Sequence, residues 1–273
     1  MEWLFLFCIG FFAATLGSII GLGGGIIIIP VLTFMSQHTG FFNEITPQYA
    51  VGISTVTIVM TALSAFFANR KKGTIAYRMG IYLFIGAAPG AFLGAFANRF
   101  LDFSEFSFYY GVFLIVAAGI LMLKSRIRPL HLKMRTYQNT YIDNQGMTHT
   151  YIYSPIIGIP LAFCVGFISG IFGIGGGTLL VPGMMLFFGV PAIVAAATSM
   201  FVILGTSVLN TVQQIAYDHI IWLYVLFLIP GAWLGGIAGP YISSKIKGRT
   251  IVILLQATMI IIGIQFIVQS FME

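Results

Sequence analysis

The sequence contains very few charged residues. Only 7% of its 273 residues are Asp, Glu, Lys or Arg, whereas 59% are hydrophobic. A water-soluble domain of this length needs far more polar surface, so the composition excludes a soluble globular protein. The bilayer must be the solvent for most of the chain. We therefore predict an all-α integral membrane protein, because helices satisfy their own backbone hydrogen bonds in lipid.

Residues that carry enzyme chemistry are also scarce. Cys8 and Cys164 are the only cysteines, and they do not occupy matching positions in the two halves of the chain. A disulfide or metal role is therefore not expected. There is no His-Glu-x-x-His motif and no glycine-rich loop followed by Lys-Ser/Thr, so we expect no enzyme, no catalytic residue, no metal and no cofactor. No acid or base lies at mid-membrane, which argues against the carboxylate relay of a proton pump.

A cleavable signal peptide is not expected either. The segment Met1–Trp3 has no basic residue, and the apolar run continues to Met35 without a small-residue cleavage site. The net charge of +6 does not indicate nucleic-acid binding, because the basic residues cluster in short loops beside apolar runs. They are better explained as orientation signals.

Two motifs occur twice in the same order. Gly21-Leu-Gly-Gly-Gly25 recurs as Gly173-Ile-Gly-Gly-Gly177, and each is followed by a proline five residues later. Pro89-Gly-Ala-Phe-Leu-Gly94 recurs as Pro230-Gly-Ala-Trp-Leu-Gly235. Two halves with both motifs indicate a transporter built from internal repeats. We assign residues 1–123 to the first repeat, 124–154 to a polar cytoplasmic linker and 155–273 to the second repeat.

Each repeat contains about four hydrophobic segments. They occupy roughly 3–35, 48–68, 79–97 and 106–123, and then 156–188, 192–211, 220–239 and 250–269. The first segment of each repeat is too long for one span and too short for two. Because glycine tolerates unwound backbone, we predict that each is broken at its glycine triplet. In the linker, β-formers on both sides of 143–146 predict a small hairpin.

The basic residues test how the repeats are oriented. Twelve of the thirteen Lys and Arg residues lie in 70–78, 124–135 and 245–249. If each repeat crosses the membrane an odd number of times, these three loops share one face. An even number would divide the charges nine to four. The positive-inside rule favours the first arrangement, so we predict inverted repeats with the basic face in the cytoplasm.

The glycine triplets are candidate binding residues. A half-helix that begins inside the membrane offers free amides and a favourable dipole to an anion. We therefore predict that Gly23, Gly24, Gly25, Gly175, Gly176 and Gly177 face a pocket between the repeats. The alternative is that these glycines only let helices pack closely, which is the preferred interpretation for the rows Gly86-xxx-Gly90-xxx-Gly94 and Gly231-xxx-Gly235-xxx-Gly239.

Buried polar side chains supply further candidates. Alignment of Pro47 with Pro191 matches Ser54-Thr55 with Thr198-Ser199, and these hydroxyls could donate to a bound oxyanion. The alternative is that Ser54, Thr55, Thr198 and Ser199 bond back to their own helices. Asn210 is a stronger candidate, because an amide inside an apolar helix is costly without a partner.

The repeated Gly-x-Gly-Gly-Gly motif with its following proline resembles the sulfite exporter TauE/SafE family of membrane permeases. The resemblance covers the chain from Gly17 to Gly239. It implies transport of small, sulfur-containing anions such as sulfite, sulfonates or related organic acids across the bacterial inner membrane. We predict a multi-pass secondary transporter working by alternating access, whose partners are the anion and the bilayer. A passive anion channel and a carboxylate or amino-acid permease stay open as alternatives, as does a homodimer.

Overall fold

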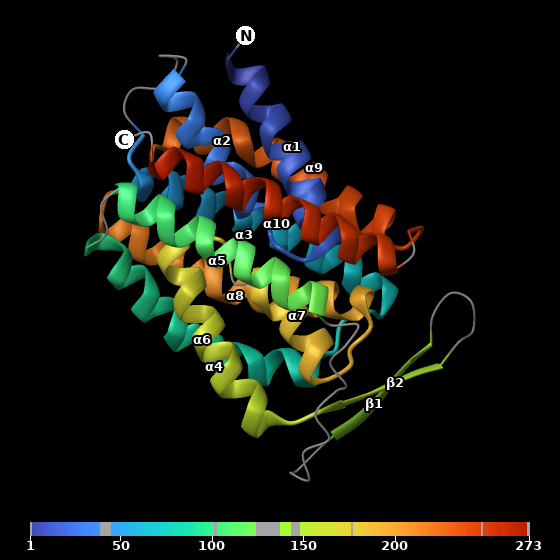
Figure 1. The fold of residues 1–273 in the computed structure, drawn as a ribbon. Helices are drawn as coiled ribbons and strands as arrows, with labels where there is room; N and C mark the ends of the chain where they lie inside the picture. The colour runs from blue at the N-terminus through green and yellow to red at the C-terminus, as the bar shows by residue number, and fades with distance from the viewer. Residues whose placement is uncertain are drawn as a thin grey trace.

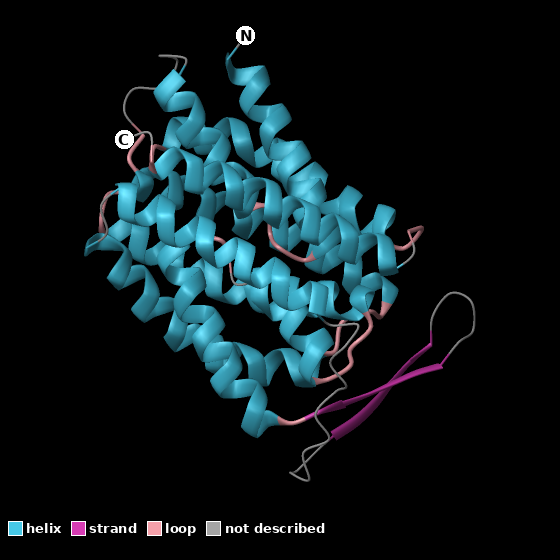
Figure 2. Cartoon of the chain, in the orientation of Figure 1, coloured by secondary structure: helices cyan, strands magenta, loops and turns pink. Residues whose placement is uncertain are grey.

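The protein is almost entirely helical. The computed structural model describes residues 2–38, 45–100, 103–123, 137–142, 148–175, 177–246 and 248–271. Its helices pack into one bundle, and the two-stranded hairpin projects from one end of the bundle (Figures 1 and 2). In chain order the elements are α1 (Glu2–Ile20), α2 (Gly25–His38), α3 (Pro47–Lys72), α4 (Tyr77–Ala97), η1 (Asn98–Phe100), α5 (Phe103–Leu123), β1 (Tyr137–Ile142), β2 (Thr148–Tyr153), α6 (Pro155–Phe172), α7 (Gly177–Phe187), α8 (Ala192–Ala216), α9 (Trp222–Ser243) and α10 (Gly248–Ser270).

Seven helices within the described ranges are long and apolar enough to cross a membrane. They are α1, α3, α4, α6, α8, α9 and α10. Large apolar side chains are exposed on the outside of the bundle, for example Ile81, Ile85 and Phe92 on α4. An apolar outer surface of this kind is what lipid contact requires. The prediction of an all-α membrane protein is confirmed, and the hairpin is the one described departure from helix.

Both long first segments are broken at their glycines, as predicted. Helix α1 ends at Ile20 and α2 begins at Gly25, while α6 ends at Phe172 and α7 begins at Gly177. The prolines lie inside the second member of each pair, where Pro30 and Pro182 are each the sixth residue of the helix. The unwinding is therefore set by the glycines, and the prolines follow one turn later.

Glycine rows bring helices of different repeats into contact. A methyl group added at Gly86, Gly90 or Gly94 of α4 would overlap a backbone carbonyl of α6. In the same way, a methyl group at Gly231 or Gly235 of α9 would overlap a carbonyl of α1. The close-packing prediction for both rows is confirmed. Helix α4 thus packs on α6, and α9 packs on α1. One helix from each repeat therefore packs against the first helix of the other repeat.

The long helices α3 and α8 run side by side in opposite directions. Near the start of α3, Gly52 abuts the carbonyl of His219, which follows the end of α8. Near the start of α8, the hydroxyl of Thr198 accepts a hydrogen bond of 3.1 Å from the amide of Ala76, which follows α3. Their middles meet at the fully buried Ile58 and Ile203. The two equivalent helices are therefore antiparallel neighbours at the centre of the bundle.

The predicted linker hairpin is present. Strands β1 and β2 pair antiparallel, with Tyr137 opposite Tyr153 and Ile142 opposite Thr148. The predicted turn at 143–146 lies outside the described residues. The hairpin docks on the bundle, because the amide of Ile152 donates to the carbonyl of Phe188 at 3.3 Å and the guanidinium of Arg78 lies 3.9 Å from the centre of the Tyr137 ring.

Candidate functional site

The first glycine break, residues Gly21–Gly25, is a tight reversal that only glycine can make. Gly21, Gly23 and Gly24 have φ values of +85°, +78° and +91°. These angles strain any residue with a Cβ. The amides of Gly21 and Leu22 both donate to the carbonyl of Gly17, at 2.8 and 2.6 Å, which closes the end of α1. In the first turn of α2, the amides of Ile27 and Ile28 donate to the carbonyl of Gly24 at 3.0 and 3.2 Å, while those of Gly25 and Ile26 have no partner within their own helix.

The second glycine break, residues Gly173–Gly177, repeats this geometry. Gly173 ends α6 in the left-handed conformation with φ +65°, and Gly175 has φ +81°. Gly177 is the first residue of α7. Gly176, a predicted binding residue, lies outside the described residues. The two breaks thus place two half-helix starts inside the bundle.

Both glycine breaks lie against Ile58 and Ile203, the isoleucines at the middles of α3 and α8. A methyl group added at Gly23 would lie 2.9 Å from a methyl of Ile58 and 3.3 Å from one of Ile203. At Gly175 both distances would be 3.0 Å. Gly25 lies close to the carbonyl of Gly173, which a methyl group would approach to 3.0 Å. The structure therefore brings Gly23, Gly25 and Gly175 together at one point, and there the two isoleucines fill the space between them.

The predicted hydroxyls tie the breaks in place. Ser54 donates a hydrogen bond of 3.3 Å to the carbonyl of Gly173, and Ser199 donates one of 2.7 Å to the carbonyl of Gly21. Each serine on a long helix thus holds the break of the other repeat. These reciprocal bonds make Ser54 and Ser199 equivalent residues. The alignment of Pro47 with Pro191 instead matched Ser54 with Thr198, so the two matches differ by one residue.

The predicted threonines have other bonds. Thr55 donates to the carbonyl of Gly52 in its own helix at 2.9 Å, and Thr198 accepts from Ala76. All four predicted hydroxyl residues are fully buried. In this conformation their hydroxyls bond to the backbone. The alternative interpretation holds for Thr55 and in part for Ser199, whose hydroxyl also lies 2.8 Å from the carbonyl of Ala196 in its own helix.

Asn210 is the predicted residue with unmet bonding capacity. Its side chain is 1% exposed, and neither its amide oxygen nor its nitrogen has a hydrogen-bond partner among the described residues. Ser207, one turn earlier on the same face of α8, is also buried with an unpartnered hydroxyl in that part of the structure. A methyl group at Gly175 would lie 3.3 Å from this hydroxyl, so the polar stripe begins beside the second break.

Two glutamines near the end of α8 lie beyond the candidate residues that the sequence indicated. The nitrogen of Gln213 donates to the carbonyl of Phe92 at 3.1 Å, and the oxygen of Gln214 lies 2.9 Å from Nδ1 of His219. The nitrogen of Gln214 and the oxygen of Gln213 have no partner in the described part of the chain. Each buried group left unpaired costs about 1–3 kcal/mol, which makes this stripe the candidate place for a ligand or water.

The stripe carries no formal charge, since α8 contains no ionisable residue. Among the described residues no three His, Cys, Asp or Glu side chains could hold a metal ion together. Cys8 and Cys164 are both free thiols. The arrangement can therefore bind a solute through neutral dipoles and half-helix ends, and it offers no group for covalent or metal chemistry.

A bundle of apolar helices, two of them interrupted at its centre beside unpaired polar groups, defines a multi-pass membrane protein of the transporter class. Comparison with known proteins agrees. A family model for "Sulfite exporter TauE/SafE" matches residues 6–266. The chain belongs to this family of membrane transporters.

Named relatives extend over nearly the whole chain. A "Probable membrane transporter protein YunE" of Bacillus subtilis is 43% identical over 99% of each chain. A "Probable membrane transporter protein MJ0441" of Methanocaldococcus jannaschii is 27% identical over 95% of this chain and 93% of its own. A "Probable membrane transporter protein" of Xylella fastidiosa is 25% identical over 84% of this chain and 80% of its own. No solved structure matches.

Proposed function

We propose that the protein is a secondary transporter of small, sulfur-containing anions such as sulfite or a sulfonate in the bacterial inner membrane. It works by alternating access around a midplane site between two inverted repeats. The observation that carries this proposal is that both glycine breaks meet at one point, with the unpartnered hydroxyl of Ser207 beside Gly175 and the unpaired amide of Asn210 one turn further along α8. Half-helix starts and neutral donors suit an oxyanion without a countercharge.

The antiparallel neighbours α3 and α8 support the inverted arrangement. A two-fold axis that relates two antiparallel helices runs perpendicular to them, and for spanning helices this means an axis in the plane of the bilayer. The packing of α4 on α6 and the packing of α9 on α1 are consistent with the same axis. This arrangement supports our proposal of two repeats, 1–123 and 155–273, joined by the linker 124–154.

The basic loops support the predicted orientation. Lys72 donates a hydrogen bond of 3.0 Å to the hydroxyl of Ser244, so the first basic loop lies beside the third. Arg78, at the end of the first basic loop, stacks on Tyr137 of the linker hairpin. The second basic segment, 124–135, lies outside the described residues. The first and third basic loops lie at one end, and the positive-inside rule favours a cytoplasmic position for that end.

Counterflow in proteoliposomes tests the proposal. Vesicles with purified protein and preloaded with unlabelled sulfite should accumulate labelled sulfite transiently against its gradient, and vesicles with Asn210→Leu should not. A passive channel gives no such overshoot, so a simple equilibration would overturn the carrier mechanism. A parallel panel of taurine, sulfoacetate and non-sulfur carboxylates tests the substrate class. Counterflow with carboxylates alone would keep the carrier and refute sulfur selectivity.

A further inference from the structure

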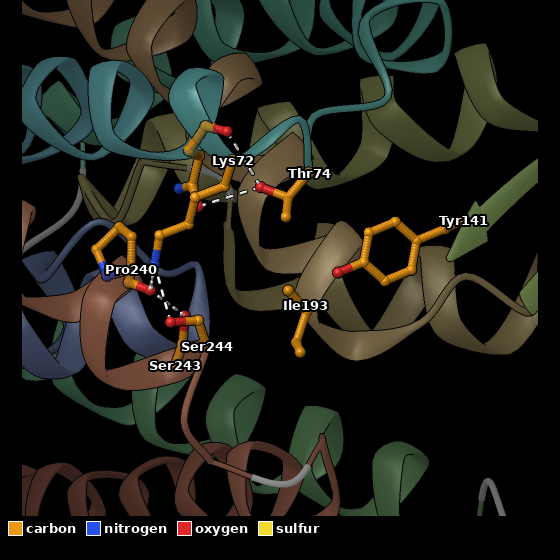
Figure 3. Close-up of a pocket in the computed structure, with 8 residues that line it drawn as sticks. Lys72, Thr74, Tyr141, Ile193, Pro240, Ser243 and Ser244 are labelled. Carbon is orange, nitrogen blue, oxygen red and sulfur yellow. Dashed lines mark hydrogen bonds between the residues drawn. The ribbon is translucent and has the colours of Figure 1, made fainter. Parts of the chain in front are cut away.

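A cavity of about 260 Å³ opens at the basic end of the protein, away from the two glycine breaks. It lies where the ends of α3 and α9 meet the start of α8. Figure 3 shows Lys72 and Thr74 on one wall, Pro240 and Ser244 below them, and Tyr141 of the hairpin reaching in from the other side above Ile193. None of the residues that line it is acidic.

One wall of the cavity carries an ammonium with spare capacity. Nζ of Lys72 donates to the carbonyl of Pro240 at 2.5 Å and to the hydroxyl of Ser244 at 3.0 Å. An ammonium has three donors, and the third has no hydrogen-bond acceptor among the described residues, where Nζ also lies 5.8 Å from the centre of the Tyr241 ring. The bond to Pro240 also neutralises a carbonyl at the end of α9, where the helix dipole would otherwise repel an anion.

A buried amide completes the wall. Asn69 is only 5% exposed, and its oxygen accepts a hydrogen bond of 3.3 Å from the hydroxyl of Thr74. This leaves its nitrogen with no hydrogen bond to any other residue that the structure describes. This nitrogen can therefore donate to an acceptor in the cavity that Asn69 lines.

The start of α8 adds a third positive group. This helix of 25 residues begins after Pro191 without a side-chain cap, and Ile193, its second residue, lines the cavity. The positive end of the helix dipole therefore borders the same cavity as Lys72 and Asn69.

We propose that this cavity binds a small oxyanion and acts as a loading vestibule at the basic face of the transporter. One face of α3 leads inward from Asn69 along the small buried Ala65 and Ala62 to Ile58 at the breaks, and in this conformation these three apolar residues are packed in a closed apolar cluster. The vestibule is one-sided, because Tyr217 stands at the equivalent end of α8 in place of Lys72. The loading role rests on the proposed function, whereas the binding of an anion does not.

Chemical protection of Lys72 tests the binding without any transport. The purified full-length protein in neutral detergent is treated with an amine-reactive acylating reagent, and the rates at Lys71 and Lys72 are followed by mass spectrometry in sodium sulfate and in sodium chloride of equal ionic strength. At about ten times its dissociation constant, sulfate should slow the reaction of Lys72 about tenfold, because only the empty fraction reacts. Lys71, which is exposed and does not line the cavity, should react at the same rate in both salts.

A matched variant keeps this test specific. Asn69→Leu removes the buried donor and leaves the lysine in place, so sulfate should lose most of its protection of Lys72. Equal protection at Lys71 and Lys72, or full protection in the Asn69→Leu variant, would overturn the proposal. Protection of Lys72 by phosphatidylglycerol nanodiscs without sulfate, relative to phosphatidylcholine, would assign the cavity to a lipid phosphate and would also overturn it.

Sided transport tests the loading role. In oriented proteoliposomes at low ionic strength, Lys72→Gln should raise the KM for sulfite several-fold from the basic face, while the KM from the other face and the maximal rate stay unchanged. Lys71→Gln removes the same charge outside the cavity and should change neither. An equal rise in KM from both faces would refute the vestibule. Absence of sulfite transport by the unaltered protein would refute the proposed substrate, while protection of Lys72 by sulfate would still establish the anion site.

Discussion

The hydroxyl of Ser199 donates a hydrogen bond of 2.7 Å to the carbonyl of Gly21, 178 residues earlier in the chain. Its partner bond, from Ser54 to the carbonyl of Gly173, runs in the opposite sense between the repeats. Each break is therefore held by the long helix of the other repeat. A movement of one break must act on the other, which is the coupling that alternating access needs.

Loss of the Ser199 bond should loosen this coupling. We expect Ser199→Ala to lower the free energy of unfolding by about 1 kcal/mol, the net value of a buried hydrogen bond. Ser54→Ala should cost less, because its bond is longer. Thermal unfolding in detergent measures both. Thr57→Val is the control, since the Thr57 hydroxyl bonds only to Ile53 of its own helix. A larger loss in this control than in Ser199→Ala would contradict the tie between repeats.

Gly24 should not tolerate a side chain. Its φ is +91°, and a methyl group would lie 2.9 Å from the carbonyl oxygen of Ala13. We expect Gly24→Ala to destabilise the protein by at least about 1–2 kcal/mol, the cost of left-handed backbone, and to reduce transport. Gly119→Ala is the matched control, because nothing lies within 4 Å of its added methyl group and alanine favours the helix. A neutral Gly24→Ala would refute the backbone argument.

Asn210 should serve transport at the expense of stability. Replacing its unpaired amide by an apolar group of similar size removes the penalty of two buried polar atoms. We therefore expect Asn210→Leu to raise the midpoint of thermal unfolding, or leave it unchanged, while transport is lost. Gln213→Leu, which breaks the bond to Phe92, should lower the midpoint instead. If Asn210→Leu melted earlier and kept its transport, the residue would be structural.

The two long helices end alike, and one of these ends is strained. Gly73 after α3 has φ +64°, and Asp218 after α8 has φ +57°, which makes it the one described residue other than glycine with a positive φ. We expect Asp218→Gly to stabilise the protein by about 1 kcal/mol and Gly73→Ala to destabilise it by a similar amount. Thermal unfolding of both variants checks the pair, and changes of the same sign would contradict it.

The hairpin should loosen at alkaline pH. Burial raises the pKa of the Tyr153 hydroxyl above its ordinary value near 10, and the neighbouring Tyr82 and Tyr137 add to the rise. The docked state therefore holds this hydroxyl neutral, whereas the undocked state ionises near pH 10. Docking is fully stable below pH 10 and weakens as the pH rises further. Tyrosinate absorbance should show late-titrating groups, one of which Tyr153→Phe removes, and an unchanged titration would contradict the docking.

Much of the architecture could be predicted from local sequence. The apolar runs set the helices, and the glycine triplets set the breaks, because unwound backbone with positive φ at Gly21, Gly23 and Gly24 is accessible to glycine alone. The rows of glycine predicted close helix contacts for the same kind of reason, which is that the missing Cβ admits a carbonyl of the facing helix. The linker hairpin followed from its β-formers.

The site was less predictable, because a side chain's role depends on what faces it. The sequence marked Ser54 and Ser199 as polar groups at membrane depth, but their hydroxyls serve the opposite breaks. The residue types of Asn210 and Ser207 do not reveal that they are unpaired, because many other polar side chains nearby are hydrogen-bonded. The fold is what leaves these two without partners among the described residues. The cavity at Lys72 could not be predicted, since its walls come from α3, α8, α9 and β1.

The sequence by itself indicated a membrane protein through its composition and two repeats through its recurring motifs. It also determined where each repeat breaks, because the backbone freedom of glycine is a local property. The tertiary structure decided that α4 packs on α6 and α9 on α1, that α3 and α8 run antiparallel, and which buried polar groups are left unpaired. These are decided by contacts between residues far apart in the chain, and no local preference encodes them.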